Sequence, residues 1–200
     1  MKVALIAASL AAASLAALAP SPPVDRETRE RQASVLLDST LRGLEPLMGS
    51  WGAPLSVTRV PPNHVVHHYA ALVGGKALRI RESFPLGRPD DAELDGLVFW
   101  NVATQRIEFV AVAGKGVGQG RSFVGEYHVR ADGGVERVYD VHYRTAADTP
   151  GEELGGTRRR YREIYRAVGK DSIEATLDWW LKGQWQPFGP GKYLLVRKAP

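Results

Sequence analysis

The sequence contains no cysteine among its 200 residues. That absence excludes disulfide bonds, thiolate metal sites, iron–sulfur clusters, cysteine nucleophiles and a lipid-carrying N-terminal cysteine. The chain also has little excess charge of either sign, because its 26 Lys and Arg nearly balance its 22 Asp and Glu and leave a formal net charge of +4 at pH 7. Basic and acidic residues are interspersed along most of the chain, as on an ordinary solvated surface. Nothing in this pattern resembles a nucleic-acid-binding module, so we expect no nucleic-acid partner.

Several motifs of catalysis and of nucleotide or metal binding are missing as well. The chain has no G-x-S-x-G elbow, no H-E-x-x-H, no P-loop and no EF-hand loop. The glycine-rich stretch over residues 114–120 does not fit G-x-G-x-x-G, and a strand is predicted after it in place of the helix that a phosphate site needs. We therefore predict no metal and no cofactor, and we assign no catalytic residue from motifs.

Long uncharged apolar stretches are confined to the N-terminus. Lys2 precedes a segment, residues 3–19, that is mostly Ala and Leu, and Ala17-Leu18-Ala19 offers an A-x-A cleavage site. We interpret residues 1–19 as a signal peptide and residues 20–24 as a short linker, and we predict a periplasmic or secreted protein. A retained anchor is the alternative, but the segment is short and weakly hydrophobic for a membrane span, so none is expected after cleavage.

The rest of the chain predicts one helix followed by strands. Over residues 25–44, apolar residues recur at helical spacing, and such an amphipathic helix must pack against another element. The 21 Gly and 13 Pro of the whole chain favour a turn-rich, strand-rich fold, and the segment after Trp51 is predicted to consist of strands. The predicted strands cover residues 55–60, 65–73, 76–84, 94–101, 106–113, 120–130, 135–144, 158–168, 171–181 and 193–198.

Nearly all of these strands are joined by tight turns, which force neighbours to be antiparallel. An open meander of this length leaves exposed edges, and closure removes them. We predict an all-β fold: an antiparallel up-and-down β-barrel of about 8–10 strands over residues 45–200, with the N-terminal helix packed on it.

Gly49-Ser50-Trp51 resembles the G-x-W signature that opens lipocalin and calycin barrels. The chain is most similar to uncharacterised bacterial lipocalin-like domains, which share this opening and a closing Gly-x-Trp-x-Pro segment, here residues 183–187. In such barrels the Trp plugs one end and a basic residue of the last strand packs on its ring, so the resemblance implies that Trp51 and Arg197 close the barrel. The chain also resembles, more distantly, the haem-binding nitrobindin barrels, in which a His near the C-terminus ligates the iron. No His follows His142 in this sequence, so we expect no haem.

Side-chain alternation predicts an aromatic interior dotted with hydroxyl groups. Glu82 lies on an apolar stripe with Leu78 and Ile80, and a buried carboxylate needs a partner. We interpret it either as a polar anchor for a ligand or as part of a structural ion pair. Such an interior suits a small hydrophobic or amphipathic molecule, although the same rings could simply fill the barrel. The candidate ligand-binding residues are Glu82, Trp100, Tyr139, Tyr143, Tyr161, Tyr165 and Trp179.

An enzyme on the same scaffold, of the isomerase, cyclase or hydrolase type, is the first alternative. It needs a general acid or base inside the barrel, and the candidates are Glu82, Glu163, His67 and His128. A metal site would combine His67 or His68 with His128 and His142. We favour a structural interpretation, in which these are surface or edge histidines.

The second alternative is an interaction module that binds no ligand. Strands 94–101 and 106–113 are apolar on both faces, and a free barrel wall should be polar outside. We therefore expect this wall to be covered, either by the N-terminal helix or by a second subunit, which makes a homodimer through residues 94–113 possible.

Overall fold

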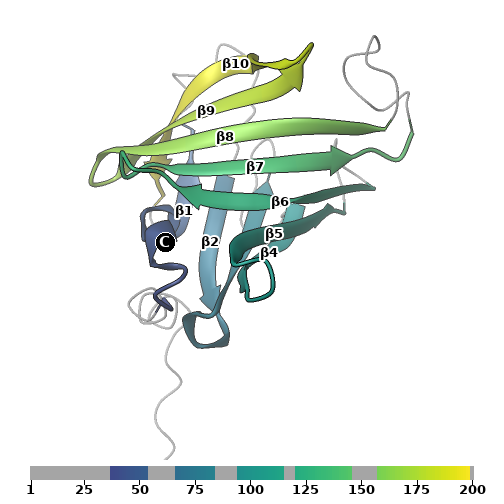
Figure 1. Cartoon of the computed structure of the whole chain (residues 1–200). Coiled ribbons are helices and arrows are strands. Elements are labelled where there is room, and N and C mark those ends of the chain that lie inside the picture. Colours follow the sequence, from purple (N-terminus) through teal and green to yellow (C-terminus); the bar gives the residue numbers. More distant parts are fainter. Residues whose placement is uncertain (1–36, 54–65, 84–93, 115–119, 146–156, 199–200) are drawn as a thin grey trace, which may run out of the picture.

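The structure is a computed structural model that describes residues 37–53, 66–83, 94–114, 120–145 and 157–198 (Figure 1). Within these residues ten antiparallel strands form one closed barrel, which confirms the predicted fold class. Each strand pairs with its neighbour in sequence, and β1 closes the ring by pairing with both β2 and β10. The strands are β1 (Gly49–Gly52), β2 (Val66–Leu72), β3 (Ala77–Ser83), β4 (Leu94–Asn101), β5 (Arg106–Ala113), β6 (Arg121–Val129), β7 (Val135–His142), β8 (Arg158–Gly169), β9 (Ser172–Leu181) and β10 (Gln184–Arg197).

The last strand differs from its prediction. β10 begins at Gln184 rather than at residue 193, because the tight turn at Lys182 and Gly183 starts a second run of pairing with β9. The register shifts between Pro187 and Lys192, so proline and glycine sit at an irregularity inside a strand. β1 is an additional strand, and the strand predicted over residues 55–60 lies outside the described residues.

The two ends of the barrel differ in their connections. Because successive strands are antiparallel, alternate connections lie at the same end. One end, which we call the floor, has the short links 73–76, 102–105, 130–134 and 170–171. The other end, which we call the rim, has the longer links 53–65, 84–93, 114–120 and 143–157, together with the tight turn 182–183.

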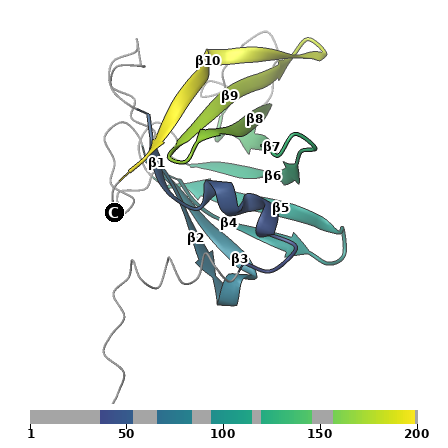
Figure 2. The same ribbon diagram turned by 90° about the vertical axis from the view of Figure 1, so that its left-hand side faces the viewer.

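A short 3₁₀ helix, η1 (Arg42–Leu47), lies across the floor (Figure 2). Leu41, Leu44 and Leu47 are buried in the same core cluster as the strand residues, so this segment caps the barrel. Most of the helix predicted over residues 25–44 lies outside the described residues, as do the predicted signal peptide and linker. In the described part of the chain, no helix has the length and apolar character needed to cross a membrane.

Trp51 lies where the chain passes from η1 into the barrel. Its indole N–H donates to the Leu47 carbonyl at 2.9 Å, and the guanidinium of Arg197 lies 4.2 Å from the centre of its ring. Arg197 also donates to the Met48 carbonyl at 3.0 Å. Gly49 has a φ of 97°, and a Cβ on it would lie 2.9 Å from Arg197 Nη1, so a glycine here lets the arginine approach.

The register fixes which side chains point inward, since directly paired residues share one face of the sheet. Tyr69 pairs with Ile80, and the same row continues around the wall to Phe123 and Arg159. The outer faces of β4–β6 carry exposed apolar side chains, with Leu97 at 43% exposure and Val110, Val112 and Val124 beside it. No described residue buries them, and the homodimer through residues 94–113 stays a prediction.

Gly125 on the inner face of β6 permits a close approach of two strands. A Cβ there would lie 2.1 Å from the Val138 carbonyl oxygen and 2.5 Å from the Tyr139 Cα, and both are backbone atoms that cannot move cheaply. We expect Gly125→Ala to destabilise the barrel by about 1–3 kcal/mol. The midpoint of thermal unfolding measures this. Gly114→Ala, where nothing lies within 4 Å of the added carbon, is the matched control, and equal midpoints for the two variants would contradict the argument.

Candidate functional site

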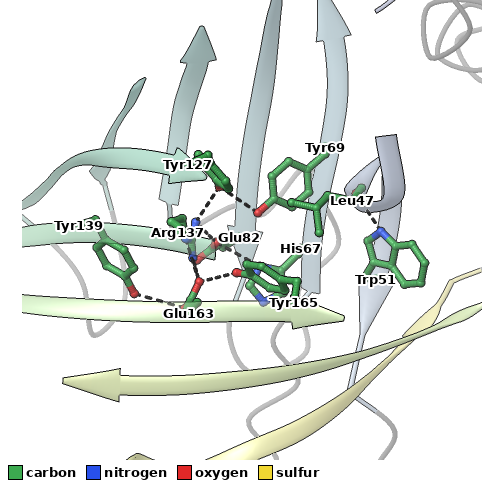
Figure 3. Close-up of polar contacts among 10 residues, drawn as sticks. All are labelled: Leu47, Trp51, His67, Tyr69, Glu82, Tyr127, Arg137, Tyr139, Glu163 and Tyr165. Carbon is green, nitrogen blue, oxygen red and sulfur yellow. Dashed lines mark hydrogen bonds and ion pairs between the residues drawn. The ribbon is translucent and has the colours of Figure 1, made fainter. Parts of the chain in front are cut away.

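A belt of charged and phenolic side chains crosses the middle of the barrel (Figure 3). Its centre is Arg137 of β7, which is 1% exposed. Nη1 of Arg137 lies 2.8 Å from Glu82 Oε1, and its Nε donates to Glu163 Oε2 at 2.8 Å. The members of this charged belt are His67, Tyr69, Glu82, Tyr127, Arg137, Tyr139, Glu163 and Tyr165.

Tyrosine hydroxyls make further hydrogen bonds to the charged groups of the belt. Tyr139 donates to Glu163 Oε1 at 3.3 Å, and the Tyr165 hydroxyl donates to Glu163 Oε2. The Tyr127 hydroxyl accepts from Arg137 at 3.5 Å and lies 3.1 Å from the Tyr69 hydroxyl. Buried polar groups are tolerated when they are hydrogen-bonded in this way. Apart from Nε2 of His67, the polar groups of the belt are therefore directed at one another.

The charge state of the belt follows from its geometry. Burial raises the pKa of Glu82, but the positive charge of Arg137 and then the interaction with His67 outweigh burial and lower it to about 2. Burial lowers the pKa of Arg137, and the charges of Glu163 and Glu82 outweigh it, so that pKa is raised well above its ordinary value. Glu82 and Arg137 are thus both ionised at neutral pH. The structural ion pair that we weighed for Glu82 is present.

Two histidines are buried, so the prediction of surface or edge histidines was wrong for them. His67 is 2% and His68 is 7% exposed. Nδ1 of His67 lies 3.1 Å from Glu82 Oε1, whereas its buried Nε2 has no hydrogen-bond partner. His128 and His142 lie on the outer face and are exposed. Among the described residues no group of three potential ligands could hold a metal ion.

Aromatic side chains line the interior between the belt and the rim. Tyr161 stacks on Tyr139 with ring centres 5.7 Å apart, and Phe188 meets both Tyr161 and Trp179 at 5.3 Å. Phe123, Trp179 and Phe188 are only partly buried, whereas Tyr139 and Tyr161 are buried. We call Phe123, Tyr143, Tyr161, Trp179 and Phe188 the rim aromatic wall.

The seven candidate ligand-binding residues fall at three levels of the barrel. Trp100 lies next to the floor, two residues before the turn 102–105. Glu82, Tyr139 and Tyr165 belong to the charged belt, where their polar atoms already have partners. Tyr143, Tyr161 and Trp179 lie toward the rim. The structure thus brings one subset of the candidates together on the rim side and separates Trp100 from it.

Arg137 is the residue that the sequence interpretation missed. It lies two residues before Tyr139 and two after Val135, so the alternation already placed it on the inward face. An arginine in mid-strand is more often solvated. The inward carboxylates Glu82 and Glu163 were the signal that a buried cation must accompany them.

No protein-family model matches the chain, and no curated protein matches it. The barrel architecture is shown by the structure, and membership of a lipocalin-like family stays a prediction.

Proposed function

We propose that this protein is an exported, lipocalin-like barrel that binds a small hydrophobic or amphipathic molecule between the charged belt and the rim. The observation that carries the proposal is the uneven burial of the interior. The side chains of the belt are buried and, apart from Nε2 of His67, hydrogen-bonded or ion-paired, while inward-facing apolar residues on the rim side, such as Trp179, Phe188 and Leu177, keep exposed surface. Covering such surface with an apolar molecule contributes a favourable free energy of about 25 cal/mol per Å² of apolar area removed from water.

The belt sets the depth of the proposed site. A ligand that passed beyond it would have to separate Arg137 from Glu82 and Glu163, and breaking a buried ion pair costs about 3–5 kcal/mol. The rim side demands no such separation. Partly exposed aromatic rings there offer flat apolar faces, which suits a ligand with an aromatic or acyl body.

The neutral fluorophore phenylnaphthylamine tests this proposal. We expect its emission to rise on binding to the wild-type protein, with one molecule bound per chain. Leu177→Trp fills the proposed site and should abolish the rise. Val124→Trp places the same side chain on the outer wall, where Val124 is exposed, and should leave binding unchanged. No binding to the wild type, or equal binding to both variants, would overturn the proposal.

Acid–base catalysis is a second candidate function, favoured by the buried pair His67–Glu82 with its unpartnered Nε2. It has less support, because the Glu82 carboxylate is also held by Arg137 and Nε2 has no surface through which a substrate could reach it. Turnover of a bound molecule that His67→Gln abolishes, while binding is retained, would establish it.

A further inference from the structure

Tyr143 and Tyr161 form a hydrogen-bonded pair of phenols on the rim side of the barrel, which we call the phenol pair. Tyr143 follows β7, and its backbone N–H donates to the Thr157 carbonyl at 2.7 Å, so it lies opposite the entry to β8. Tyr161 lies four residues after Thr157. The two hydroxyl oxygens are 2.7 Å apart, so the side chains lean toward each other along the inner face. Both are buried, Tyr143 at 8% and Tyr161 at 4% exposure.

The phenol pair keeps one proton that none of the described residues accepts. Two hydroxyls carry two protons, and the bond between them uses one. The other contacts of the pair are made by its rings: Tyr161 stacks on Tyr139 and meets Phe188 edge-on, and the Arg121 guanidinium lies 4.6 Å from the centre of the Tyr143 ring. A buried O–H without an acceptor is unfavourable. The pair therefore offers a hydrogen-bond donor to a bound molecule.

The phenol pair is neutral at neutral pH. Burial is the largest influence on both phenols and raises their pKa, and the hydrogen bond between them adds to this rise at Tyr161 and opposes it at Tyr143. Both hydroxyls therefore keep their protons. A neutral donor in a buried position favours a neutral acceptor, because a carbonyl group loses less hydration than a carboxylate when it leaves water.

The phenol pair adjoins the part of the rim aromatic wall that keeps exposed surface. Tyr161 contacts Phe188, which contacts Trp179, and the last two are only partly buried. The belt contains a second pair of phenols, Tyr69 and Tyr127, with hydroxyls 3.1 Å apart, but each of these is 2% exposed and lies among buried groups. A molecule on the aromatic wall can thus reach the phenol pair without separating the groups of the belt.

We propose that the barrel takes a planar aromatic molecule with a neutral carbonyl group, whose oxygen accepts a hydrogen bond from the phenol pair while its rings lie against the rim aromatic wall. A carbonyl oxygen has two lone pairs and no proton, which matches a site that offers a donor. Aromatic rings bind one another in offset-stacked or edge-on arrangements, and the wall offers both faces and edges. This inference rests on the proposed function and adds the chemical class of the ligand.

Displacement of bound phenylnaphthylamine by fluorenone and by fluorene tests the inference. The two molecules share one planar skeleton and differ in a single group, which is C=O in fluorenone and CH₂ in fluorene. We expect fluorenone to bind the wild-type protein about tenfold more tightly. Water hydrates the carbonyl group, so a site without a donor would instead favour fluorene. The hydrogen bond should also lower the carbonyl stretching frequency of bound fluorenone below its value in a hydrocarbon solvent.

Tyr143→Phe combined with Tyr161→Phe removes both hydroxyls of the phenol pair and keeps both rings. We expect the ratio of fluorenone to fluorene affinity to fall about tenfold in this double variant. Tyr69→Phe combined with Tyr127→Phe is the matched control, because it removes the hydroxyl pair of the belt, and it should keep the wild-type ratio. Each ratio compares two molecules on one variant, so a general loss of stability does not change it.

Two results overturn the inference while phenylnaphthylamine binding still stands. One is a wild-type protein that binds fluorene as tightly as fluorenone, with an unshifted carbonyl frequency. The other is an equal ratio of affinities in the two double variants. If phenylnaphthylamine itself does not bind to the wild-type protein, the proposed function fails.

Discussion

Replacement of Arg137 by methionine is expected to destabilise the barrel by about 3–5 kcal/mol. The guanidinium is buried between two carboxyl groups, and its removal leaves Glu82 and Glu163 buried without the cation that both contact, in a medium that solvates charge poorly. For a domain of this size, a loss of this magnitude lowers the midpoint of thermal unfolding by about 6–20 °C. Circular dichroism during heating, and urea titration at neutral pH, measure it.

Two further variants separate the charge effect from a packing effect. Arg137→Met combined with Glu82→Gln and Glu163→Gln removes all three charges, and we expect it to recover much of the lost stability, because a buried ion cluster is about neutral against uncharged groups of similar volume. Arg160→Met breaks an exposed pair with Asp140 and should cost at most about 1 kcal/mol. A triple variant no more stable than Arg137→Met would contradict this account of the belt.

Steep unfolding above pH 10 is the second large effect that we expect. The pKa of each of the seven tyrosines is raised by burial, to about 12 for Tyr127. In the unfolded chain the phenols lose their protons near pH 10, while in the fold they keep them. The unfolded state then binds fewer protons, so stability falls as pH rises, by about 1.4 kcal/mol per pH unit for each tyrosine held neutral.

The near-ultraviolet absorbance of tyrosinate, followed together with circular dichroism, measures this effect. We expect little tyrosinate while the fold persists and its abrupt appearance when the barrel unfolds. The same chain in urea is the control, and its phenols should titrate near pH 10. Phenols that titrate near pH 10 with an unchanged circular dichroism spectrum would show that the tyrosines are accessible, and would contradict the packed belt.

The architecture was predictable because local signals carry it. The turns at residues 102–105 and 131–134 lie between strands of alternating pattern, and tight turns leave no alternative to antiparallel pairing. The start of β10 was harder to predict from the sequence, because Pro187 and Gly189 are residue types that ordinarily end strands. Only pairing with β9 keeps this segment in the sheet. Local preference gave way there to tertiary hydrogen bonding.

The belt could not be predicted as a unit, although the inward faces of its strands could. Glu82 lies on β3 and Arg137 on β7, so their contact crosses the barrel between strands that do not pair. Sequence alternation says that both side chains face inward, but strand tilt and register decide which ones meet. The division of the candidate residues into floor, belt and rim groups depends on the same geometry.

The account predicts a ligand that stops at the belt, and nuclear magnetic resonance shift mapping with phenylnaphthylamine tests this most directly. We expect the largest shifts at the side chains of Phe123, Tyr143, Tyr161 and Trp179, and unchanged signals for Trp100 and Leu44 on the floor side. Shifts that concentrate on Leu97, Val110 and Val124 of the outer wall, or that reach Trp100 and Leu44 as strongly as Trp179, would contradict it.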